Sequence, residues 1–77
     1  MPKLLLFAQA RDVAGCRSAD VEADTVGGVL KSAAARWPGL DAVIAVSAVW
    51  VNGEPADPEQ AVAAGDEVAV LPPVSGG

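Results

Sequence analysis

The chain has 77 residues, a formal net charge of −5, 52% hydrophobic residues and only 4% aromatic ones. A chain this short forms one domain and buries too little surface for a deep catalytic cleft, while its hydrophobic fraction excludes a disordered protein. The lone Cys16 excludes an internal disulfide, and no apolar run is long enough for a signal peptide or a membrane span. We therefore expect a soluble cytoplasmic protein.

Charge is distributed unevenly along the chain. Residues 37–77 contain six acidic residues and no lysine or arginine, so every basic residue precedes them: Lys3, Arg11, Arg17, Lys31 and Arg36. An acidic surface repels nucleic acid and attracts a basic partner, and we expect the second half to face such a partner. The alternative is that the acidic residues only keep a small domain soluble.

Two strands are predicted in the first third of the chain. Residues 3–8 are almost continuously apolar, which is typical of a strand buried on both faces at the centre of a sheet. Residues 12–15 break this pattern, and residues 17–23 then alternate weakly between apolar and acidic side chains. This alternation predicts an edge strand that pairs with the first as a hairpin.

An amphipathic helix is predicted over residues 26–36, with Thr25 as its N-cap. Pro38-Gly39 ends it. The pair Gly27-Gly28 falls in its first turn, where each glycine costs roughly 1 kcal/mol relative to alanine. This start either frays or packs closely against the sheet, and the sequence does not distinguish the two.

A second hairpin is predicted after the helix. Residues 44–51 are rich in β-branched side chains, which favours a strand. Asn52-Gly53 is a strong signal for a hairpin turn, and residues 54–56 can form a short return strand.

The last strand is predicted at residues 67–71. Residues 58–64 form a short connection with room for one helical turn, and Gly65-Asp66 turns the chain into the strand. Pro72-Pro73 stops it, because proline lacks the backbone N–H that a sheet requires.

This order of elements predicts an α+β fold of the β-grasp, or ubiquitin-like, class. One main helix crosses one face of a mixed four- or five-stranded sheet, with the first and last strands as central neighbours. Residues 1–71 form the domain, and residues 72–77 form a flexible tail.

Ordinary active-site constellations are missing from the sequence. There is no histidine, no tyrosine, no phosphate-binding loop and no dinucleotide fingerprint. Cys16 lacks a second metal ligand or an activating histidine, which favours an incidental thiol. Asp66 and Glu67 are adjacent on a strand and point to opposite faces, so they do not form a catalytic carboxylate pair. We expect no self-contained active site, no metal site and no bound cofactor.

The tail is the distinctive feature, and it consists of Pro72, Pro73, Val74, Ser75, Gly76 and Gly77. Two prolines favour an extended conformation, so six residues reach about 20 Å from the sheet. Glycines thread a narrow channel and leave the terminal carbonyl of Gly77 open to attack. A free carboxylate acylates poorly and requires activation by a separate enzyme with ATP.

Three stretches carry a family resemblance: residues 6–15 (LFAQARDVAG), 51–53 (VNG) and 65–77 (GDEVAVLPPVSGG). Together they resemble the small, sulfur-carrying subunits of molybdopterin synthase, the MoaD family, over essentially the whole chain. The second stretch and the GDEV motif are shared with other sulfur carriers, including the thiazole-forming ThiS proteins.

The resemblance implies a role and a set of partners. An E1-like adenylyltransferase (MoeB-like) adenylates Gly77 with ATP, and a sulfurtransferase supplies the sulfur that converts it to a thiocarboxylate. The tail then enters the large synthase subunit (MoaE-like) and donates sulfur to cyclic pyranopterin monophosphate. The family docks through a hydrophobic surface, and the matching positions are Phe7, Leu71 and Pro55; packing in the core is the alternative for Phe7 and Leu71.

Other functions fit the same features. The chain could carry sulfur for thiazole, cysteine or tRNA thiolation, or it could be a ubiquitin-like modifier joined to lysines through Gly77. A plain interaction module with an inert tail is the third alternative.

Overall fold

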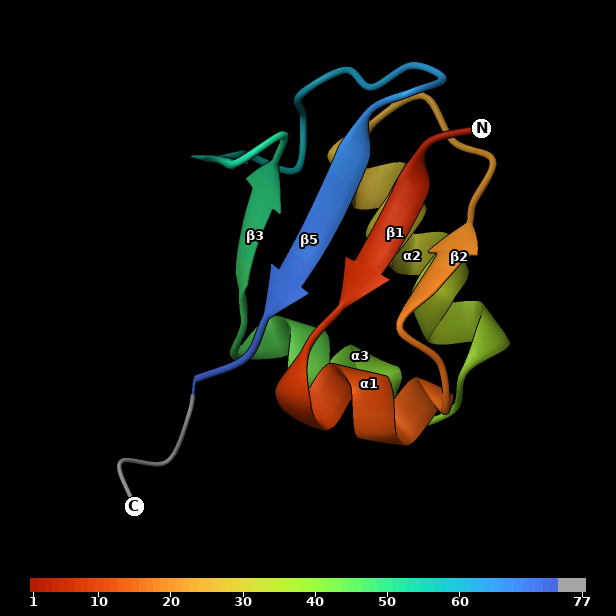
Figure 1. Ribbon diagram of the computed structural model, residues 1–77, viewed down its shortest axis with the longest axis vertical. Coiled ribbons are helices and arrows are strands. Elements are labelled where there is room, and N and C mark those ends of the chain that lie inside the picture. Colours follow the sequence, from red (N-terminus) through yellow and green to blue (C-terminus); the bar gives the residue numbers. More distant parts are fainter. Residues whose placement is uncertain (74–77) are drawn as a thin grey trace.

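The computed structural model describes residues 1–73, which form one mixed five-stranded sheet and three helices (Figure 1). The strands are β1 (Lys3–Leu6), β2 (Ser18–Asp20), β3 (Ala48–Val51), β4 (Glu54–Pro55) and β5 (Glu67–Leu71). The helices are α1 (Ala8–Ala14), α2 (Val26–Arg36) and α3 (Leu40–Ala45). The strand order β2-β1-β5-β3-β4 is that of the predicted β-grasp fold.

The first and last strands are central neighbours, as predicted. β1 and β5 run parallel, with Leu4 opposite Val68 and Leu6 opposite Val70. β3 flanks β5 on its other side, and the pairs β1–β2, β3–β5 and β3–β4 are antiparallel. The strand that leads into the tail is therefore hydrogen-bonded on both sides.

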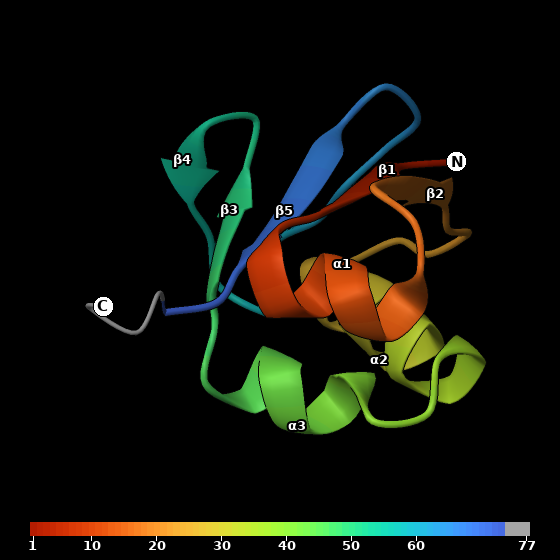
Figure 2. The same cartoon turned by 60° about the horizontal axis from the view of Figure 1, so that its bottom comes forward.

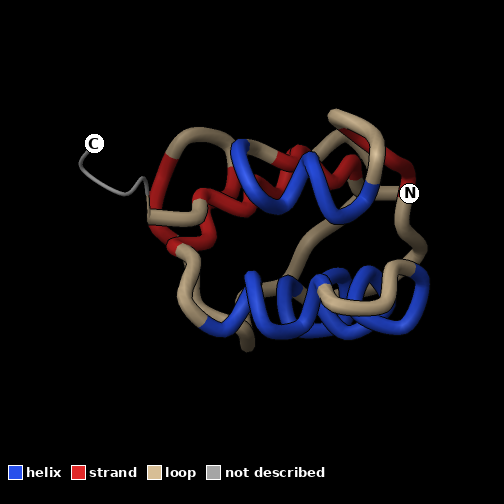
Figure 3. Tube along the Cα trace, turned by 90° about the horizontal axis from the view of Figure 1, so that it is seen from below, coloured by secondary structure: helices blue, strands red, loops and turns tan. Residues whose placement is uncertain are grey.

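The core lies between the sheet and α2. Alternate side chains of the central strands, Leu4, Val68 and Val70, are fully buried on the face that meets the helix. Val29 and Ala33 of α2 are fully buried against them. α2 and α3 form a layer beneath the sheet, while α1 lies at the end of the sheet where β1 and β5 finish (Figures 2 and 3).

The sequence did not decide whether the start of α2 frays or packs closely, and the structure shows its contacts. The Thr25 hydroxyl oxygen accepts a hydrogen bond from the Gly28 N–H at 3.0 Å, which confirms the predicted N-cap. A Cβ atom at Gly27 would lie 3.1 Å from the Pro58 carbonyl oxygen, and one at Gly28 would lie 3.1 Å from the Ala23 Cβ. The two glycines therefore permit close packing of the helix start.

Two predicted strands are wrong in part. The strand predicted at residues 3–8 ends at Leu6, and residues 8–14, including part of the predicted break at 12–15, form α1. The strand predicted at residues 44–51 begins at Ala48, because residues 40–45 form α3. Ala10 of α1 and Leu40 of α3 are fully buried. In each helix this burial outweighs the β propensity of the sequence.

The connections also differ from the prediction. The edge strand predicted at residues 17–23 spans only Ser18–Asp20. It pairs antiparallel with β1, but α1 lies between the two strands in the chain, so they do not form a tight hairpin. Residues 58–64 contain turns instead of a helical turn, and the Pro58 and Gln60 carbonyls accept hydrogen bonds from the first N–H groups of α2. These bonds satisfy donors at the start of α2 and hold the segment against the helix.

The turn at Asn52-Gly53 is joined to the turn at Asp66. Asn52 and Gly53 have φ values of +50° and +84°, as a tight hairpin turn requires. The Asn52 amide donates to the Asp66 carboxylate at 3.0 Å and accepts from the Glu67 N–H at 3.0 Å. The other Asp66 oxygen accepts from the Ala63 N–H at 2.8 Å. This turn clasp ties β3 to β5 at the end of the sheet opposite the tail.

The clasp makes stability depend on pH. The hydrogen bonds from the Ala63 N–H and from Asn52 lower the pKa of Asp66 below its ordinary value of 3.8. A carboxyl with a lowered pKa in the folded state stabilises the fold above pH 3.8, and this contribution disappears as the pH falls through the lowered value.

We therefore expect Asp66→Asn to lower the melting temperature at about pH 7, with the difference from the wild type shrinking as the pH falls below 3.8. Thermal unfolding followed by circular dichroism across this range measures the effect. Glu59→Gln removes the same charge from an exposed loop, and its melting temperature near neutral pH should equal that of the wild type. A constant difference between Asp66→Asn and the wild type at all pH values would contradict the assignment.

Candidate functional site

One face of the sheet points away from α2 and α3 and carries a row of apolar side chains. Leu5 pairs with Ala69, Ala69 pairs with Trp50, and Trp50 pairs with Pro55. These four residues, which we call the outer row, therefore cross β1, β5, β3 and β4 in one line. Leu5 and Ala69, which lie on the neighbouring strands β1 and β5, are half-buried, and Pro55 is exposed.

Phe7 and Leu71 extend this apolar face toward the tail. Leu71 is half-buried and pairs with Ala48, and Phe7 follows β1 in an extended conformation with 44% of its surface exposed. Extended strands alternate faces, so Phe7 and Leu71 lie on the same face as Leu5 and Ala69. The structure thus brings the three suggested docking positions, Phe7, Leu71 and Pro55, onto one face, and neither Phe7 nor Leu71 belongs to the buried core.

Sequence reasoning missed Trp50, the largest side chain of the outer row. It is 36% exposed, while its strand neighbours on the core face are the half-buried Val49 and the buried Val51. The alternation of residues 48–51 carried this signal, because Val49 and Val51 on the core face require Trp50 on the other. Aromatic side chains that are partly exposed are frequent anchors at protein interfaces.

The backbone at Ala8 positions Phe7. Ala8 has a φ of +50°, in the left-handed region that side chains other than glycine rarely adopt. This conformation turns the chain sharply from β1 into α1 and leaves Phe7 at the corner. Strain of this kind costs about 1–2 kcal/mol and persists where surrounding structure enforces it.

The base of the tail lies beside these residues. β5 ends at Leu71, Pro72 is buried and Pro73 is exposed. The prolines provide no N–H to continue the sheet, so the chain leaves it at the edge where Phe7 and Leu71 lie. The remaining tail positions, Val74, Ser75, Gly76 and Gly77, the last of which is the predicted site of activation, lie outside the described residues.

The rest of the described body offers little reactive chemistry. Among residues 1–73 no group of three or more potential metal ligands lies together, and Cys16 is half-buried between α1 and β2. No helix in this part of the chain is long and apolar enough to cross a membrane.

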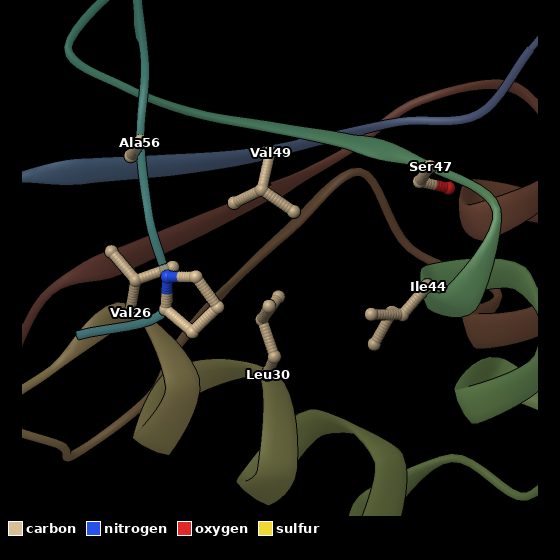
Figure 4. A pocket seen from close by; sticks show the side chains of 7 residues that line it. Val26, Leu30, Ile44, Ser47, Val49 and Ala56 are labelled. Carbon is tan, nitrogen blue, oxygen red and sulfur yellow. The ribbon is translucent and has the colours of Figure 1, made fainter. Parts of the chain in front are cut away.

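A pocket of about 310 Å³ opens between α2 and β3 (Figure 4). Val26 and Leu30 face Val49 across it, and Ile44 closes one side. Its hydroxyl group, on Ser47, already donates a hydrogen bond to the Val43 carbonyl at 2.6 Å. This pocket is an apolar gap in helix packing without a titratable group in its lining.

The exposed position of Phe7 can be tested by comparing the stability loss of its alanine variant with that of the buried neighbour Leu6. Leu6 is only 2% exposed, so Leu6→Ala should lower the free energy of unfolding by about 2–5 kcal/mol. Phe7→Ala removes a larger side chain from the surface and should lower it by at most about 1 kcal/mol. Urea denaturation measures both, and an equal loss would place Phe7 in the core.

The strained corner predicts an unusual response to glycine. Ala8→Gly relieves the left-handed conformation and should leave the free energy of unfolding unchanged or raise it by up to about 1 kcal/mol. The control Ala10→Gly, within the same helix, should lower it by about 1 kcal/mol or more, because Ala10 is helical and fully buried. A clear loss of stability in Ala8→Gly would contradict the corner geometry.

Comparisons with known proteins agree with this architecture. The chain is 40% identical to small archaeal modifier protein 1 of Haloferax volcanii, over 94% of this chain and 95% of that protein. It is 36% identical to the molybdopterin synthase sulfur carrier subunit of Chlamydomonas reinhardtii, over 97% and 96% of the two chains.

A solved structure shares both the fold and the length. The crystal structure of small archaeal modifier protein 1 from H. volcanii superposes with a TM-score of 0.84 at 39% identity, covering 99% of this chain and 98% of that one. The sequence model of the ThiS family matches residues 4–77. The chain therefore belongs to the ThiS family of ubiquitin-like β-grasp proteins.

Proposed function

We propose that this chain is the sulfur carrier subunit of molybdopterin synthase, with Gly77 as the residue that carries sulfur. The observation that supports this most is that the central strand β5 leads directly into the tail, beside an apolar face of the sheet. The similarity to the C. reinhardtii sulfur carrier subunit supports the choice of pathway.

The proposed chemistry begins at the terminal carboxylate. An E1-like adenylyltransferase catalyses attack of the Gly77 carboxylate on the α-phosphate of ATP, which gives an acyl-adenylate and releases pyrophosphate. A sulfide equivalent from a sulfurtransferase then forms a C–S bond as the bond to AMP breaks, leaving a thiocarboxylate. In the large synthase subunit this sulfur passes to cyclic pyranopterin monophosphate, and water restores the carboxylate.

The body of the chain contributes binding and orientation. The outer row, with Phe7 and Leu71, offers apolar surface that both the adenylyltransferase and the large subunit can cover in turn. A few buried residues supply most of the free energy of a typical interface, and tryptophan is frequent among them. A rigid central strand delivers the tail from that interface, so the reacting carbonyl arrives in a defined direction. We place this cycle in the cytoplasm.

A second candidate function is protein modification. The similarity to small archaeal modifier protein 1 favours it, because the two chains match over nearly their full lengths. Sulfur delivery to thiazole, cysteine or tRNA fits the same body. Copurification of a large synthase subunit distinguishes the proposed pathway from these, while an isopeptide-linked ladder on cellular proteins would support the modifier.

Removal of Gly77 provides the direct test of function. Chains would be activated with the adenylyltransferase, ATP and sulfide, then mixed with the large subunit and cyclic pyranopterin monophosphate. We expect deletion of Gly77 to abolish formation of molybdopterin, because the reacting carbonyl is displaced by one residue. The control Cys16→Ser should retain wild-type yield. Loss of activity in Cys16→Ser with retention in the deletion would contradict the mechanism.

A further inference from the structure

Acidic residues gather at the end of the sheet where β1 and β5 begin, although they come from separate parts of the sequence. Asp20 and Glu67 flank Lys3 in the strand register, and Glu54 and Asp66 lie at the turns of the turn clasp. The tail leaves from the opposite end. The helices at the tail end, α1 and α3, contain one acidic residue each, Asp12 and Asp41.

Two arginines lie close together at the tail end. Arg11 of α1 and Arg17, just before β2, line a pocket of about 440 Å³ together with Leu5, Leu6, Phe7 and Ser18. Both arginines are exposed. We call this group the arginine pocket.

The arginine pocket is continuous with the apolar face. It shares Leu5 with the outer row, and it shares Phe7 with the base of the tail. Ser18 pairs directly with Leu5 on the neighbouring strand, so the pocket lies on the β2 side of the face. A protein that covers Phe7 and holds the tail therefore meets both guanidinium groups at the edge of its contact.

We propose that the adenylyltransferase that receives the tail presents carboxylate side chains to Arg11 and Arg17, beside an apolar patch that covers Phe7. This inference rests on the proposed function and specifies the charge of its partner. From the sequence we expected a basic partner, whereas the two arginines at the tail end favour an acidic partner surface.

The physical role of the two arginines is orientation and rate of association. Guanidinium groups bind carboxylates through two parallel N–H donors, which fixes direction as well as distance. At the rim of an interface, charges mainly raise the association rate, and salt screens their effect over about 10 Å at 0.1 M ionic strength. The arginines then align the chain so that the tail points into the active site.

Charge reversal tests the inference. Arg11→Glu and Arg17→Glu would be compared with Lys31→Glu, which makes the same change at an exposed position on α2. The dissociation constant for the adenylyltransferase would be measured by surface plasmon resonance at about 0.1 M and about 0.5 M salt. Melting curves and the neutral variants Arg11→Gln and Arg17→Gln separate charge effects from loss of folding.

We expect each arginine reversal to weaken binding about threefold to tenfold at low salt, mainly through the association rate, with a smaller effect at high salt. Each Gln variant should show an intermediate loss, and Lys31→Glu should bind as the wild type does. Equal affinities for all variants, with normal wild-type binding, would overturn this inference and leave the proposed function standing. Failure of the wild-type chain to bind the adenylyltransferase would contradict both.

Discussion

The parallel pairing of β1 with β5 is the interaction on which the other features depend. It joins the first and last strands of the described domain at the centre of the sheet, where Leu4, Leu6, Val68 and Val70 form the middle of the core. Because β5 is also paired with β3, the last strand is held on both sides. A tail that follows such a strand starts from a fixed point, which a carrier of a reactive group requires.

The same pairing divides the molecule into two ends with different roles. At one end the turn clasp between Asn52 and Asp66 fixes β3 against β5, so the VNG and GDEV motifs have a structural role there. At the other end lie Phe7, the arginine pocket and the base of the tail. Motifs that sulfur carriers share thus include some that build the fold and others that lie where a partner can reach them.

The sequence was sufficient wherever local signals decided the structure. The N-cap at Thr25, the strand at residues 67–71 with its flanking turn and prolines, and the turn at Asn52-Gly53 each depend on a few residues, and all three were predicted correctly. The short helices α1 and α3 were missed, because their stability comes from packing of Ala10 and Leu40 against distant residues. The arginine pocket was missed for a related reason, since the pairing of Leu5 with Ser18 brings its residues together. Trp50 was missed although the alternation of residues 48–51 indicated its outward position.

The central claim is that this body exists to present Gly77 for sulfur loading. The most direct measurement is the intact mass of the chain after incubation with the adenylyltransferase, ATP and a sulfur source. The account predicts a mass increase equal to the exchange of one oxygen for one sulfur, located at Gly77 by fragmentation and absent when ATP is omitted. An unchanged mass under conditions in which the adenylyltransferase loads a known carrier, or sulfur located on Cys16, would contradict it.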